Sequence, residues 1–125
     1  MLSFEAAAKS NLTGTIFTWA YSHPCFTPIL ERIETIISSH RGQILFVFLH
    51  CSQIILEERV TGIDRKQKGK IYTVEKLRRQ QIAKNHVEIP GKNSLVIDNS
   101  YLQPEKCADK IVSHFKLPRV NYYAM

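Results

Sequence analysis

The sequence predicts an α/β protein in which a three-stranded parallel sheet is flanked by helices in three layers. Apolar or β-branched stretches at 13–20, 44–49 and 95–97 alternate with amphipathic stretches, and no hairpin signal joins any two of them. Parallel strands need long crossovers, which the amphipathic stretches supply as helices. We expect residues 1–117 to form one α/β domain and residues 118–125 to be a disordered tail.

The N-terminal third predicts a helix, a strand and a second helix. Residues 2–9 are rich in alanine, which favours a helix. Residues 13–20 (TGTIFTWA) are β-branched and aromatic, which favours a strand. Thr27 followed by Pro28 is typical of a helix cap and first position, so a helix is predicted over 27–40, with its isoleucines on one face.

The middle of the chain predicts a buried strand followed by two helices. Residues 44–49 are almost wholly apolar, which indicates a central strand buried on both faces. Ser52 is predicted to cap a helix that ends near Arg59. The polar segment 61–70 contains two glycines and is predicted to be a mobile loop. Thr73 is then predicted to cap a helix that extends to about residue 85.

The C-terminal part predicts one further βα unit. Residues 87–93 contain Pro90-Gly91 and indicate a loop, and residues 95–97 a short buried strand. Pro104 is predicted to begin a last helix that extends to residue 114.

Positive charge is concentrated in one segment. The chain has a net charge of +6, and residues 59–84 contain nine lysines and arginines against Asp64 and Glu75, a balance of +7 that leaves −1 for the rest. This segment is either a solvated basic surface or the site of an anionic partner. One hypothesis is therefore a non-catalytic module that binds nucleic acid or another polyanion through residues 59–84.

Cysteine and histidine usage predicts a cytoplasmic protein without a metal site. The three cysteines are an odd number without close spacing, and the five histidines show no metal-binding pattern. No apolar run reaches the ~18 residues that would span a bilayer, and the N-terminus lacks the features of a secretory signal. We therefore expect no membrane association.

Four segments in order resemble the C-terminal part of a small kinase. FVFLHCSQIILEERV, TGIDRKQKGK, LVIDNS and PEKCADKIVSHF together resemble the C-terminal two-thirds of P-loop kinases of the shikimate kinase and small-molecule kinase group, over residues 12–117. The resemblance implies an intact relative that transfers the γ-phosphoryl group of ATP, with Mg²⁺, to a small hydroxyl acceptor.

The same resemblance assigns roles to particular residues. It implies that Arg59 and Arg65 are catalytic lid arginines, that Lys70 assists them at the nucleotide phosphates, and that the segment 98–100, Asp98-Asn99-Ser100, lies beside the adenine. The alternatives are structural. Arg59 would then interact with a helix C-terminus, Arg65 would be a solvated loop residue, and Asn99 or Ser100 would start the turn into the last helix.

The chain lacks the phosphate-binding motif of this kinase group. No G-x-x-x-x-G-K-[ST] pattern occurs, so neither the backbone nest nor the phosphate lysine is present. We expect this chain to be inactive alone and to bind neither ATP nor Mg²⁺.

The strand order of the kinase group adds a prediction about assembly. That order is 2-3-1-4-5, and the three strands predicted here resemble the third, fourth and fifth. The first strand, between the third and fourth, has no counterpart, and unpaired backbone groups beside the resulting slot would be costly. The chain would close the slot, fill it with a strand from a partner, or derive from a truncated gene model. We expect self-association through open sheet edges, and a sheet-completing partner subunit is the third hypothesis.

Overall fold

The computed structural model describes residues 2–10, 14–84 and 86–119. Within these residues the protein is a mixed α/β structure of six helices and two strands. The chain divides into two compact units. The first contains the residues up to Ile44 together with Arg78–Gly91, and the second contains Leu45–Leu77 and the residues from Lys92 onwards.

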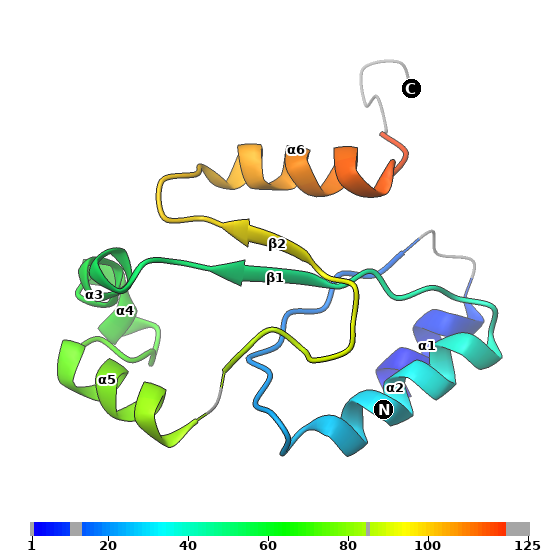
Figure 1. Cartoon of the computed structure of the whole chain (residues 1–125), viewed down its shortest axis with the longest axis horizontal. Coiled ribbons are helices and arrows are strands. Elements are labelled where there is room, and N and C mark those ends of the chain that lie inside the picture. The colour runs from blue at the N-terminus through cyan, green and yellow to red at the C-terminus, as the bar shows by residue number, and fades with distance from the viewer. Residues whose placement is uncertain (1, 11–13, 85, 120–125) are drawn as a thin grey trace. The chain divides into compact units, whose positions relative to one another are not determined.

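The first unit contains two of the predicted helices. Helix α1 (Leu2–Lys9) and helix α2 (Thr27–Ser39) pack against each other (Figure 1), and Leu30 and Ile33 of α2 are buried. Thr27 is the first residue of α2 and does not cap it. The predicted cap is wrong because Phe26 occupies the cap position and Thr27 already lies within the helix, where its hydroxyl hydrogen-bonds the phenol of Tyr21 at 3.0 Å.

The predicted strand at 13–20 is wrong over its described residues. Residue 13 lies outside the described part, and residues 14–20 form neither strand nor helix. The neighbouring backbone forms one isolated antiparallel bridge, between Ser22 and His86. β propensity alone does not make a strand, because a strand also requires a partner for its backbone groups.

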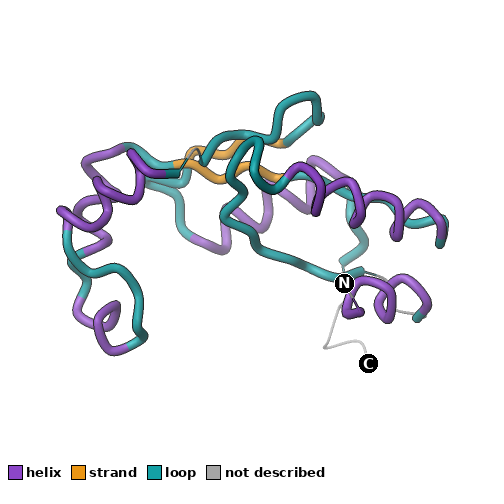
Figure 2. The backbone as a smooth tube through the Cα atoms, turned by 90° about the horizontal axis from the view of Figure 1, so that it is seen from below, coloured by secondary structure: helices purple, strands orange, loops and turns teal. Residues whose placement is uncertain are grey.

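The second unit contains a parallel pair of strands. Strand β1 (Val47–His50) pairs with strand β2 (Leu95–Asp98), with Val47 opposite Leu95, and the two lie side by side in both views (Figures 1 and 2). The predicted parallel pairing is confirmed, but within the described residues the sheet has two strands rather than three.

The prediction that the first of these strands is buried on both faces is wrong. Leu49 is 50% exposed. Helix α6 (Pro104–Phe115) packs against β2, close to the predicted bounds for the last helix. The core of this unit is small, because only Val60 and Ile97, each 3% exposed, are its buried apolar residues among those described.

Three helices follow β1. Helix α3 (Gln53–Val60) is capped as predicted by the Ser52 hydroxyl, which accepts the N–H of Ile55 at 3.4 Å. Helix α5 (Val74–Ala83) begins in the second unit and ends in the first, and the Thr73 hydroxyl accepts the N–H of Lys76 at 3.2 Å, confirming the second predicted cap.

The segment predicted to be a loop at 61–70 contains a short helix, α4 (Ile63–Gln67). Lys68, one position beyond its end, forms a 3.0 Å salt bridge with Asp64 four residues earlier, an arrangement that favours a helical turn. The loop predicted at 87–93 is confirmed, with Gly91 at a φ of 75° that favours glycine. No helix in the described part of the chain is long and apolar enough to cross a membrane.

Candidate functional site

The first candidate site lies where the two strands end. β1 and β2 are parallel, so their last residues, His50 and Asp98, lie side by side at the carboxyl ends of the strands. Open α/β sheets commonly bind ligands at this end. The N–H of Asn99 donates to the His50 carbonyl at 2.9 Å. The Ser100 hydroxyl accepts the N–H of Ser52 at 2.8 Å and donates to Asp98 Oδ1 at 2.6 Å. Ser100 therefore joins the segments that follow the two strands.

These hydrogen bonds lower the pKa of the Asp98 carboxyl below its ordinary value of 3.8. The largest cause is the hydroxyl of Ser100, followed by the N–H of Ser100, and the positive field of His50 contributes less. Both donors favour the ionised carboxylate because it is the better acceptor. Asp98 therefore carries a negative charge at this turn at neutral pH.

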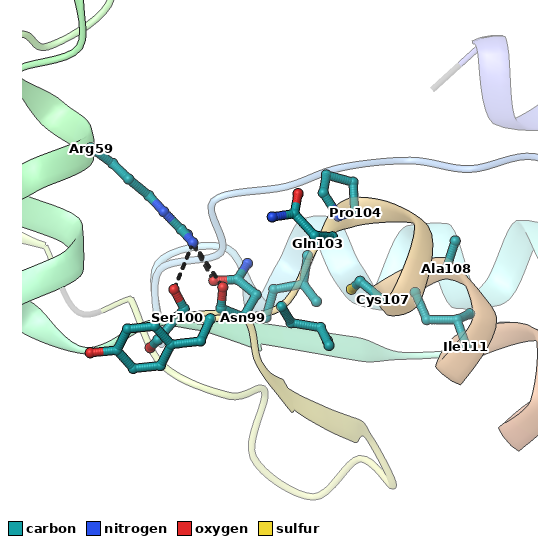
Figure 3. A pocket seen from close by; sticks show the side chains of 11 residues that line it. Arg59, Asn99, Ser100, Gln103, Pro104, Cys107, Ala108 and Ile111 are labelled. Carbon is teal, nitrogen blue, oxygen red and sulfur yellow. Dashed lines mark hydrogen bonds between the residues drawn. The ribbon is translucent and has the colours of Figure 1, made fainter.

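Arg59, in the last turn of α3, reaches across to the residues after β2 (Figure 3). Its Nη1 donates to Asn99 Oδ1 at 3.0 Å, and its Nη2 donates to the carbonyls of Asn99 at 2.8 Å and Ser100 at 3.2 Å. We call this set, Arg59 with Asn99 and Ser100, the arginine clasp. It uses both Nη nitrogens on oxygens of the protein itself, so it fixes the β2–α6 turn to α3.

A groove of about 760 Å³ lies beside the arginine clasp. Residues of the clasp and the β2–α6 turn form its polar end, and apolar side chains of α6 form the other (Figure 3). The apolar end includes Pro104, Cys107, Ala108 and Ile111. Cys107 is a free thiol that is partly buried.

The second candidate site lies on α4 and α5. The Nζ atom of Lys66 is 5.4 Å from the centroid of the Tyr72 ring, and the Nζ atom of Lys76 is 5.2 Å from it. We call Lys66, Tyr72 and Lys76 the lysine–tyrosine cluster. The negative face of the ring attracts each ammonium group, which lets two like charges share one small surface. Tyr72 remains 36% exposed.

The cluster keeps its positive charge available. Among the described residues, Lys66, Lys76 and the exposed neighbour Lys70 have no salt-bridge partner. Arg65, in contrast, donates its Nε–H to the carbonyl of Ile71 at 2.7 Å. That bond, and the one from the Lys70 N–H to the Arg65 carbonyl at 3.0 Å, hold the chain between α4 and Tyr72.

The structure brings together only part of the predicted site. Arg59, Asn99 and Ser100 meet in the arginine clasp, and Asp98 joins them through Ser100. Neither Arg65 nor Lys70 lines the groove beside the clasp. These two residues belong instead to the chain that carries the lysine–tyrosine cluster.

The lysine–tyrosine cluster was not predicted from the sequence. The available signal was Tyr72, the single aromatic residue within the basic segment 59–84. Its pairing with Lys66 and Lys76 depends on the turn between α4 and α5. Only the first part of this turn lies in the segment 61–70 that was predicted to be a mobile loop.

The described part of the chain contains no group of histidine, cysteine, aspartate or glutamate residues that could hold a metal ion. Comparison with protein-family models, with curated proteins and with solved structures found no match for this chain.

Proposed function

We propose that this chain acts by itself as a non-catalytic module that binds a flexible polyanion, with single-stranded nucleic acid as the favoured class. The main support for this proposal is the lysine–tyrosine cluster, in which two ammonium groups lie close to one partly exposed ring. Lys70 adds a third positive charge close by in the sequence, and none of the three has a salt-bridge partner in the described residues.

The chemistry of the cluster suits a phosphate chain better than a single small anion. Ammonium groups act as compact point charges that do not fix one phosphate geometry. Several such charges along a segment release counterions from a polyanion, which supplies most of the affinity in sequence-independent binding. An exposed aromatic ring beside them offers a surface on which an unpaired base can stack.

The test is the salt dependence of binding to a labelled 15-nucleotide single strand, followed by fluorescence anisotropy. Each neutralised phosphate contributes about −0.7 to the slope of log K against log salt concentration. The double variant Lys66→Gln/Lys76→Gln should weaken binding and reduce the magnitude of the slope by about 1.4.

The matched control is Lys106→Gln/Lys110→Gln, which removes the same charge from exposed positions of α6. It should leave most of the slope and affinity in place. Equal losses in the two double variants would show that net charge alone attracts the strand, and the assignment to the cluster would then be wrong.

A second candidate function follows from the resemblance to P-loop kinases. In the kinase strand order the fourth and fifth strands are neighbours, and β1 and β2, which resemble them, are parallel neighbours joined through α3–α5. This arrangement supports the proposal of a kinase-like domain whose intact relative transfers a phosphoryl group from ATP. Arg59, Arg65 and Lys70 would then contact phosphates, and the segment after β2 would lie beside the adenine.

This second proposal predicts no ATP–Mg²⁺ affinity in the micromolar range for the chain alone. The Gly-rich nest and its lysine are missing, and both Nη nitrogens of Arg59 already donate to the β2–α6 turn. Calorimetric titration with ATP–Mg²⁺ measures this directly. Micromolar affinity would reveal a nucleotide site that the kinase motif does not account for.

A further inference from the structure

The segment at 15–20 has the side-chain alternation of a strand although it lacks strand pairing. The rings of Phe17 and Trp19 have centroids 6.1 Å apart, and those of Trp19 and Tyr21 are 5.4 Å apart. Residues two apart share a side only when the chain is extended. Ile16, whose side chain belongs to the opposite side of the extended segment, is 95% exposed.

Contacts within the first unit hold this segment in place. The ring centroids of Phe17 and Phe4 are 5.0 Å apart, and those of Trp19 and Phe26 are 5.5 Å apart. The contacts of the segment within the first unit therefore involve its aromatic side. Residues 15–20 make no backbone hydrogen bonds to other described residues.

Strand β1 also has an open edge. The carbonyls of Phe46 and His50 accept N–H groups from the β2 side, so the even-numbered residues of β1 direct their backbone polar groups towards β2. Val47 and Leu49 direct theirs to the opposite edge, where the described residues provide no hydrogen-bond partner. That edge carries neither a lysine nor a proline, the residues that usually protect an edge from pairing.

We propose that residues 15–20 of one copy of this chain add as a strand to the open edge of β1 in a second copy. Residues 15–20 have no ionisable side chain, so no charge repulsion opposes their pairing with β1, and both segments contain β-branched or aromatic residues. Six extended residues span about 20 Å, enough to cover the four residues of β1. Pairing satisfies the backbone groups that each segment leaves open in the single chain.

The test compares two proline variants by sedimentation equilibrium from low to high micromolar concentration. Leu49→Pro removes an N–H that points to the open edge of β1 and leaves the β1–β2 bonds intact. Val96→Pro is the matched control, because the N–H of Val96 points to the outer edge of β2. The native chain should dimerise, Leu49→Pro should raise the dissociation constant about tenfold or more, and Val96→Pro should leave it unchanged.

The segment at 15–20, which forms the other side of the proposed interface, is tested with two further proline variants. Thr15→Pro and Thr18→Pro remove N–H groups from opposite edges of the segment, and both residues are exposed. One of the two should weaken the dimer even if Leu49→Pro fails to fold. Trp19 is the only tryptophan, so its fluorescence should change with protein concentration in the native chain. A native chain that stays monomeric throughout, or a dimer that is insensitive to all three of these variants, would overturn the proposal.

Discussion

Two groups of basic residues in the second unit differ in how their charge is used. In the arginine clasp, the guanidinium of Arg59 donates three hydrogen bonds to Asn99 and Ser100. In the lysine–tyrosine cluster, the ammonium groups of Lys66 and Lys76 lie over the face of a ring and form no salt bridge within the described residues. The planar fork of arginine suits fixed acceptors, whereas lysine stays a solvated point charge. The comparison indicates that a basic segment can combine a structural cation with cations that remain available to a partner.

The largest effect should come from breaking the arginine clasp. Arg59→Leu leaves the carbonyls of Asn99 and Ser100 without their donor, and it should lower the free energy of unfolding by about 1–2 kcal/mol, because hydrogen bonds to a charged donor are stronger than neutral ones. Lys66→Leu removes the same charge from the lysine–tyrosine cluster and should change the free energy of unfolding by less than about 0.5 kcal/mol. Urea denaturation measures both, and equal destabilisation would remove the distinction between the two groups.

A smaller effect on the free energy of unfolding is expected at Ser100, which the arginine clasp shares with the end of β2. Ser100→Ala removes the acceptor of the Ser52 N–H and the main donor to Asp98. It should lower the free energy of unfolding by about 1 kcal/mol, since Ser52 loses a hydrogen bond. It should also raise the pKa of the Asp98 carboxyl towards 3.8, which a carboxyl-detected NMR titration reports. An unchanged pKa would show that the hydroxyl of Ser100 is not the main cause of the lowered pKa of Asp98.

The smallest effect concerns acid stability. The folded protein lowers the pKa of Asp98, so the resulting stabilisation is present above about 3.8 and is lost as pH falls through the lower pKa of the folded state. Asp98→Asn removes this contribution. The native chain should therefore have the higher denaturation midpoint at pH 7, and the difference should shrink below pH 3.8. A difference that grows on acidification would contradict the direction of the pKa shift.

Local signals in the sequence predicted much of the second unit. Ser52 and Thr73 cap their helices as expected, because a capping hydroxyl acts within three residues along the chain. The parallel pairing of β1 and β2 was also predicted, since the helical segments between them provide a long crossover.

Features that depend on contacts between distant residues were not predictable in the same way. The segment at 14–20 has strand-forming residues, yet pairing depends on a neighbour that the pattern does not specify. Arg59, Asn99 and Ser100 were all selected from the kinase resemblance, but their mutual hydrogen bonds join residues about 40 positions apart. The role of Tyr72 was missed for a different reason. Its contacts with Lys66 and Lys76 are local, but they depend on how α4 turns into α5, which a polar, glycine-containing sequence does not indicate.

The most direct test of the central claim is an NMR titration of the native chain with a 15-nucleotide single strand, which follows each backbone amide. Binding at the lysine–tyrosine cluster should shift the amides of residues 66–76 in proportion to occupancy, while those of Asn99 and Ser100 stay in place. Shifts concentrated at residues 99–102, with little change on α4 and α5, would place the anion at the arginine clasp and contradict the account.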